Sequence, residues 1–297
     1  MQPITDPTTL GFSAERLARL DKYLAGYVDD GRLAGWQLAL TRRDQLAHFS
    51  SYGARDKEAG LPAEPDTIWR IASMTKPITT VTAMTLWQQG VFSLQDPISK
   101  WIPSFENVRV YDKGTPAALF TVPAIEPIRV WHLMSHTSGL TAGFMQSSVV
   151  DALYRQAGYE WGAPPKESIA QCVEDWAALP LLFQPGSAWG YGVSTDVLGR
   201  LIEIWTGESL DEAFASRVLG PLGMTDTAFY ADDTRIDRLA ALYVRNPENG
   251  QALRQDWGPP GPQKLPAVLS GGGGLISTTS DYVRFTRMLA RGGELDL

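Results

Sequence analysis

The sequence predicts an α+β protein, and three observations support this fold class. A helical pattern followed by an alternating segment at 35–53 indicates a small N-terminal layer of helix and strands. A long apolar segment beginning near residue 73 indicates a central helix. Beyond residue 91, helical patterns alternate with loops rich in proline and glycine. With 44% apolar and 20% charged residues, the 297-residue chain has an ordinary globular composition.

The N-terminal layer contains one helix and two strands. Residues 13–28, "SAERLARLDKYLAGYV", repeat apolar side chains at helical spacing behind a capping serine. Residues 35–53, "GWQLALTRRDQLAHFSSYG", predict two short strands that turn at Arg43 and Asp44.

The central helix begins near Ser73 and runs through "ITTVTAMTLWQQ". Its residues are apolar almost all round, so we expect most of its sides to be buried. Gly90 stands where a helix commonly ends, because glycine adopts the left-handed conformation at that position without strain.

The remaining chain is predicted to be mostly helical, with few strand signals. Residues 194–205, "STDVLGRLIEIW", place apolar side chains on one helical face, and Gly207 follows directly. Ser209 to Glu212 form a capping box that opens the next helix. After the glycine run 271–274, "LISTTSDYVRFTRMLARGG" predicts another capped helix.

These patterns predict three parts. Residues 1–90 form the first part of an α/β domain with the central helix, 91–265 form a mostly helical inserted domain, and 266–297 return to the first domain.

Charge and cysteine content exclude several classes of function. The net charge of −7 argues against nucleic acid or an anionic membrane as the main partner. The N-terminal residues show no basic segment followed by an apolar run, and no apolar run approaches the ~18 residues of a membrane span. Cys172, the single cysteine, lies in a helical pattern and is predicted to be a small core residue. We therefore expect a cytoplasmic protein.

Ser73 and Lys76 form an S-x-x-K pattern at the start of the central helix. Serine is a preferred N-cap residue, so a purely structural role is one interpretation. The other is catalytic, because Lys76 occupies the position where a capping box has glutamate. A cation at the positive end of the helix dipole is unfavourable unless another function requires it.

The catalytic interpretation follows from the surroundings of the pair. The neighbours Ile71, Ala72 and Met74 are apolar and would partly desolvate the amine. Desolvation favours the neutral form of a lysine, which can take the proton of an adjacent hydroxyl during attack. Amides at the N-terminus of the same helix could stabilise an oxyanion.

Tyr191 is the predicted second base or proton shuttle. It lies in the glycine-flanked segment "GSAWGYGVSTDVLG" just before a helix, where a loop can present its side chain to a cleft. The alternative is a tyrosine packed in the core with its hydroxyl satisfied.

Two other patterns have weaker functional interpretations. His132 and His136 have the i, i+4 spacing of a metal pair, but the H-E-x-x-H glutamate and a third ligand are missing, which favours buried, hydrogen-bonded histidines. Gly271–Gly274 lack the Lys-Ser/Thr of a phosphate loop, which favours a hinge or a close approach of backbone to ligand. No metal or cofactor is therefore expected.

Five segments together resemble serine hydrolases related to class C β-lactamases. They occur in the family's order and approximate spacing: "WRIASMTKPITTVTAM", "RVWHLMSHTSGL", "FQPGSAWGYGVSTDVLGRLIE", "VLGPLGMTDTAF" and "LSGGGGLISTTSDYVRF". The S-M-T-K-P form is similar to family VIII carboxylesterases. The resemblance implies an antiparallel sheet flanked by helices, with a large helical domain inserted after the catalytic helix. It also implies that Ser73 is acylated, that Lys76 and Tyr191 share the proton transfers, and that water releases the acyl group.

The chain departs from the family pattern at two points. The relatives that act on β-lactams usually have asparagine where Val193 stands, which favours esters over lactams because valine cannot donate to an amide side chain. The third family motif, K-T-G or a substitute, lies on a strand after the last helix, and no such strand precedes Leu297. That strand normally supplies an oxyanion amide, whose loss costs about 10²–10³ in rate. We expect missing C-terminal strands or strand exchange with another chain, and poor ester turnover by the isolated chain.

The sequence thus predicts a serine hydrolase that cleaves short-chain carboxylic esters. Ser73, Lys76 and Tyr191 are the expected catalytic residues. Trp69, Trp189, Gly272 and Gly273 are expected to bind substrate. The expected partner is a small-molecule ester, with homo-oligomer formation as one way to complete the sheet. A β-lactamase or D-alanyl-D-alanine peptidase, a non-catalytic binding protein of the same fold, and an acyltransferase are the alternatives.

Overall fold

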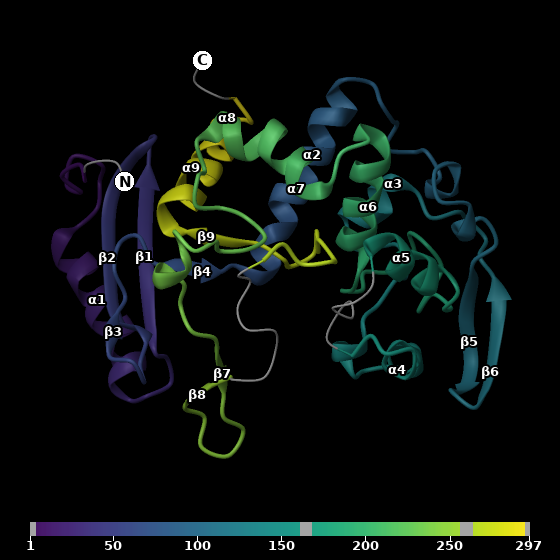
Figure 1. The fold of residues 1–297 in the computed structure, drawn as a ribbon, viewed down its shortest axis with the longest axis horizontal. Coiled ribbons are helices and arrows are strands. Elements are labelled where there is room, and N and C mark those ends of the chain that lie inside the picture. The colour runs from purple at the N-terminus through teal and green to yellow at the C-terminus, as the bar shows by residue number, and fades with distance from the viewer. Residues whose placement is uncertain (1–3, 161–167, 256–263, 295–297) are drawn as a thin grey trace. The chain divides into compact units, whose positions relative to one another are not determined.

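The computed structural model describes residues 4–160, 168–255 and 264–294. The chain divides into two compact units, and Figure 1 shows their elements. The first unit consists of Met1–Arg70, Leu219–Leu265 and Leu275–Leu297, and the second of Ile71–Val218 and Pro266–Gly274. Helices and antiparallel strands occur in the same chain, which confirms the predicted α+β class. In the described part of the chain, no helix combines the length and apolar character that a bilayer span requires.

The unit boundaries differ from those expected from the sequence (1–90, 91–265 and 266–297). The helix α2 (Thr75–Gln88) belongs to the second unit because it packs against helices of that unit. Residues 219–265 belong to the first unit instead of the inserted region. The second unit therefore starts at Ile71, just before the S-x-x-K pattern.

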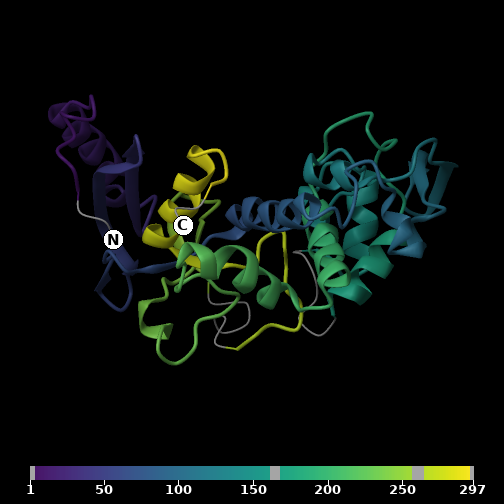
Figure 2. The ribbon, with the colours of Figure 1, turned by 90° about the horizontal axis from the view of Figure 1, so that it is seen from above.

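The first unit is built on an antiparallel sheet between two helices. Strands β1 (Gly35–Arg42), β2 (Gln45–Asp56) and β3 (Leu61–Pro62) pair in that order. Helix α1 (Ala14–Asp29) packs on β2 and α9 (Thr279–Ala290) packs on β1, so the sheet lies between them, as Figures 1 and 2 both show. This arrangement agrees with the predicted sheet flanked by helices.

Local sequence signals determine the ends of these elements. The Ser13 hydroxyl accepts a hydrogen bond from the Arg16 amide and caps α1, as predicted. Arg43 and Asp44 both have positive φ (49° and 64°), which is the backbone of a tight two-residue hairpin turn. The Asp44 carboxylate pairs with arginines of α9, so the turn is also anchored by tertiary contacts.

The rest of the first unit contains two short strand pairs. Strand β4 (Ile68–Arg70) pairs antiparallel with β9 (Ile276–Thr278), and Ile68 and Ile276 are buried in a small core. Strands β7 (Tyr243–Arg245) and β8 (Ala252–Arg254) form a hairpin that the sequence analysis did not predict. The remaining elements of this unit are α8 (Gly220–Leu222) and the 3-10 helix η6 (Ile236–Arg238).

The second unit is mostly helical, with α6 (Ser194–Thr206) at its centre. Helix α6 contacts α2, α3 (Val130–Met134), α5 (Ile169–Ala177) and α7 (Leu210–Phe214), and Figure 1 shows α2, α3 and α7 gathered around it. Its predicted apolar face is buried, and Gly207 ends it with a positive φ of 73°. Further elements of the unit are η1 (Ala72–Met74), η2 (Ile98–Lys100), η3 (Pro103–Phe105), η4 (Gly143–Met145), α4 (Val149–Gln156) and the π-helical turn η5 (Ala215–Leu219). The hairpin of β5 (Arg109–Thr115) and β6 (Ala118–Pro123) was not predicted.

The buried face of α2 carries threonines as well as apolar side chains. Thr79 and Thr82 are fully buried, and each hydroxyl donates to the carbonyl four residues earlier. Gly90 has a positive φ and follows the last turn, as predicted. Cys172 on α5 is also fully buried, as expected for a core residue.

Candidate active site

The chain enters α2 through the 3-10 turn η1, which contains Ser73. The prediction that Ser73 caps the helix is wrong: the N-cap residue is Met74, and no side chain makes a capping bond there. Ile71 and Met74 both have helical backbone angles, so the extended geometry of a serine N-cap is not available. Ala72 adopts a positive φ of 43°, a strained conformation for a residue with a Cβ. The exposed Ser73 hydroxyl is therefore available for other contacts.

Lys76 lies one turn after Ser73, with its amine directed to the serine hydroxyl. The amine donates to Ser73 Oγ at 3.2 Å and also to the Gly272 carbonyl. The side chain is half-buried, and Nζ lies 4.6 Å from the centroid of the Tyr191 ring. The predicted proximity of amine and hydroxyl is thus present in the second unit.

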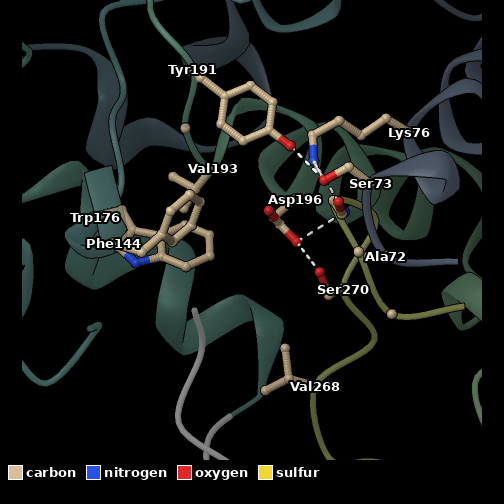
Figure 3. A pocket seen from close by; sticks show the side chains of 14 residues that line it. Ala72, Ser73, Lys76, Phe144, Trp176, Tyr191, Val193, Asp196, Val268 and Ser270 are labelled. Carbon is tan, nitrogen blue, oxygen red and sulfur yellow. Dashed lines mark hydrogen bonds between the residues drawn. The ribbon is translucent and has the colours of Figure 1, made fainter. Parts of the chain in front are cut away.

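Tyr191 reaches the same hydroxyl from the loop before α6. Its Oη lies 2.5 Å from Ser73 Oγ, and either oxygen can donate. The neighbouring glycines are required by close packing. A Cβ on Gly190 would meet the Phe183 ring at 2.7 Å, and one on Gly192 would meet the Thr141 backbone at 2.5 Å. The structure brings Ser73, Lys76 and Tyr191 together, as Figure 3 shows.

The glycine run forms one side of the site. A Cβ on Gly271 would lie 2.8 Å from the Thr195 carbonyl oxygen, and one on Gly272 would lie 2.3 Å from Asp196 Oδ2. Gly272 is buried, whereas Gly273 is exposed, and both line the same cavity as Ser73. Glycine is needed here because the backbone passes directly against α6.

Asp196 was missed by the sequence analysis. It lies in the first turn of α6, where an acidic residue is commonly explained by the helix dipole. Its Oδ1 accepts hydrogen bonds from Ser270 Oγ at 2.5 Å and from the Gly272 amide at 3.0 Å. Burial raises the pKa of Asp196, and the bonds from Ser270 and Gly272 partly oppose this shift.

These residues line a cavity of about 340 Å³ in the second unit. Its polar side holds Ser73, Lys76 and Asp196, and Figure 3 shows the apolar side opposite. That apolar side is formed by Phe144, Trp176, Val193 and Val268. An enclosure of this kind suits a small molecule with one polar and one apolar end.

The two tryptophans expected to bind substrate lie elsewhere. Trp69 belongs to the first unit, where its indole donates to Gln37 Oε1 at 2.9 Å and its side chain lines another cavity. Trp189 is 66% exposed, and its ring centroid lies 6.4 Å from that of Tyr191. Neither residue lines the cavity that contains Ser73.

The histidines of "RVWHLMSHTSGL" have different surroundings. His132 is buried, and its Nδ1 accepts a hydrogen bond from the Arg129 amide at 3.0 Å. His136 stacks on Tyr191 with 5.0 Å between ring centroids, and its Nδ1 has no hydrogen-bond partner in the described part of the chain. Burial lowers the pKa of His136, and the nearby Lys76 lowers it further. Among the residues described, no three His, Cys, Asp or Glu side chains form a group suited to a metal ion.

The geometry supports nucleophilic chemistry at Ser73. A serine hydroxyl is a weak nucleophile unless an adjacent group accepts its proton. Here two such groups, an amine and a phenol, contact the same oxygen. Neither group needs to move far to take the proton.

The fold and this cluster define a β-lactamase-like protein, and the comparisons agree. The beta-lactamase family matches residues 20–297, and the chain belongs to this family. Protein Rv1367c of Mycobacterium tuberculosis is 38% identical over 268 residues, which cover 90% of this chain and 65% of that protein. Esterase EstB of Burkholderia gladioli is 30% identical over 94% of this chain and 71% of its own length. The chain thus spans slightly less than two thirds of Rv1367c.

A solved structure has the same fold. EstCE1, described as a hydrolase with promiscuous acyltransferase activity, superimposes with a TM-score of 0.77 at 27% identity. The match covers 94% of this chain and 74% of EstCE1.

Proposed function

We propose that the protein is a serine hydrolase that cleaves short-chain carboxylic esters through an acyl-enzyme on Ser73. The observation that carries the proposal is the convergence of Lys76 Nζ and Tyr191 Oη on Ser73 Oγ, at 3.2 and 2.5 Å. The similarity to EstB and EstCE1 supports ester chemistry in particular.

In acylation, Ser73 Oγ attacks the ester carbonyl carbon while its proton passes to the Lys76 and Tyr191 pair. The bond between carbonyl carbon and alcohol oxygen then breaks, and the alcohol leaves with that proton. In deacylation, water attacks the acyl carbon, gives a proton to the same pair, and Ser73 recovers it as the acid leaves. One pair thus serves as base and as acid in both halves.

The cavity favours a small acyl group over a β-lactam. A volume of about 340 Å³ accommodates a short chain against Phe144 and Trp176. Val193 is 5% exposed on the apolar side and offers no hydrogen-bond donor to an amide side chain. Gly272 and Gly273 are proposed to contact the substrate because they line the cavity beside Ser73.

Labelling with a fluorophosphonate and turnover of a p-nitrophenyl butyrate ester test the proposal together. Wild-type protein should be labelled and Ser73→Ala should not. Parallel assays with a chromogenic cephalosporin test the lactam alternative, and cephalosporin turnover far above ester turnover would reverse the preference. Absence of any label on wild-type protein would favour a non-catalytic binding protein.

Acyl transfer is a second candidate, favoured by the description of EstCE1. The same acyl-enzyme would then react with an alcohol in place of water. Adding a primary alcohol to the ester assay distinguishes the two: a transferase forms the new ester in excess of the free acid at millimolar acceptor, whereas a hydrolase forms the acid.

A further inference from the structure

The carboxylate of Asp196 lies beside the proposed catalytic residues without contacting Ser73. Figure 3 shows it on the polar side of the cavity, directed at the segment that contains Ser270. Its Oδ1 accepts two hydrogen bonds from that segment, from Ser270 Oγ and from the Gly272 amide. Burying a carboxylate is costly, so its retention here indicates a role that these bonds serve.

The Gly272 amide belongs to a peptide unit that is bonded on both sides. The carbonyl of this unit is that of Gly271, and it accepts a hydrogen bond from Thr79 Oγ1 at 2.7 Å. The peptide between Gly271 and Gly272 is therefore fixed between Thr79 on α2 and Asp196 on α6. We refer to these two contacts as the peptide clamp.

The clamp fixes the next carbonyl along the chain, that of Gly272. This carbonyl accepts a hydrogen bond from Lys76 Nζ, the same atom that donates to Ser73 Oγ. A flexible lysine side chain needs such a partner to keep its amine in one place. A substituent on Gly272 would collide with Asp196 Oδ2, so the close contact also depends on this glycine.

We infer that Asp196 is a positioning residue for Lys76: it fixes the Gly272 peptide, and the Gly272 carbonyl directs the amine to Ser73. The inference rests on the proposed function, because it assigns a role within the Ser73 chemistry. Hydrogen-bond acceptance by Oδ1 is the required property, and the negative charge is not.

Two substitutions separate these properties. Asp196→Asn keeps an oxygen that can accept both bonds and removes the charge, whereas Asp196→Ala removes both. Because misplacement by about 1 Å costs on the order of 10²-fold in rate, Asp196→Ala should lower kcat for p-nitrophenyl butyrate by about that factor with little change in KM. Asp196→Asn should restore kcat to within about fivefold of wild type. Glu174→Ala, which removes an exposed carboxylate in the same unit, is the control.

Thr79 provides a test from the other side of the clamp. Thr79→Val removes the hydroxyl with little change of shape and should also lower kcat, whereas Thr79→Ser keeps the hydroxyl and should not. Thermal unfolding of each variant identifies any that fail to fold. Equal kcat for Asp196→Ala and wild type, or equal loss in Asp196→Asn and Asp196→Ala, would overturn the inference.

A readout without turnover separates this inference from the proposed function. Hydrogen exchange of the Gly272 amide, followed by NMR, should accelerate at least about tenfold in Asp196→Ala and remain slow in Asp196→Asn, because only the first loses the acceptor. Unchanged exchange in Asp196→Ala sinks the clamp, whatever the activity. Wild-type protein that resists the fluorophosphonate while showing this exchange pattern would refute the proposed function and leave the clamp intact.

Discussion

The two units each contain a cavity of similar size, and the cavities differ in how their polar groups are bonded. In the second unit, the amine and phenol at about 340 Å³ both bond to one serine hydroxyl. In the first unit, a cavity of about 470 Å³ is lined by several arginines that bond outward to the surrounding fold. Arg70 donates to the Ala240 carbonyl, and Arg55 to the Pro62 carbonyl and to Glu64. Mutual contact among polar groups, more than volume, distinguishes a reactive site.

The largest effect is expected from removing the atom on which the second cavity converges. Ser73→Ala should lower ester turnover by roughly 10⁴–10⁶-fold, because the amine and phenol then have no nucleophile to activate. Ester hydrolysis and fluorophosphonate labelling measure the change. Ser93→Ala, on an exposed turn of the same unit, should behave as wild type. Turnover by Ser73→Ala near the wild-type rate would remove the distinction between the cavities.

Loss of the phenol hydroxyl should have the next largest effect. Tyr191→Phe keeps the ring that stacks on His136 and removes the oxygen 2.5 Å from Ser73, which should lower kcat by about 10²–10³-fold. Tyr27→Phe makes the same chemical change in the first cavity, where the hydroxyl bonds only to Tyr23 among the described contacts. Its kcat should match wild type, and equal losses in both variants would contradict the comparison.

Acidification should destabilise the protein partly through His136. The pKa of this imidazole is lowered in the folded state, so the unfolded chain takes up a proton first as the pH falls through about 6.5. Its contribution to stability is present above that pH and is lost below it. Between pH 7.5 and 5.5, the melting temperature of wild type should therefore fall further than that of His136→Phe. A difference of order 1 kcal/mol corresponds to about 2–4 °C.

The matching histidine does not confuse this measurement. Burial also lowers the pKa of His132, but that residue is present in both proteins and its contribution cancels. Parallel melting curves for the two proteins across this pH range would show that His136 stays uncharged in neither state or titrates equally in both.

The smallest effect is expected in the first cavity. Arg70→Met removes the hydrogen bond to the Ala240 carbonyl and should destabilise folding by about 1–2 kcal/mol. Thermal unfolding should detect the change, whereas kcat for the ester should stay within twofold of wild type. A loss of kcat comparable to that of Tyr191→Phe would mean that the outward-bonded arginines also serve the reaction.

Local signals explain why much of the first unit could be predicted. The Ser13 cap, the alternation of 35–53 and the turn at Arg43 and Asp44 each depend on residues close in sequence. The two missed hairpins lack such signals. Strands β7 and β8 have three residues each, and the partly exposed pair β5 and β6 carries an irregular register.

The site was predictable only where sequence spacing fixes geometry. Ser73 and Lys76 lie one turn apart, so their contact follows from the helix. Asp196 became visible only through tertiary contact, since Gly272 is 76 residues away in sequence. Trp69 was expected near the site because it precedes Ser73 by four residues, but strand β4 directs its indole to Gln37.

The buried position of the only cysteine has a practical consequence. Cys172 has no solvent-exposed surface, so thiol reagents should leave the folded protein unmodified. A single cysteine introduced at the exposed position of Trp189 would then carry the sole accessible sulfur, next to Tyr191. A fluorophore attached there could report ligand entry without any background from the native chain.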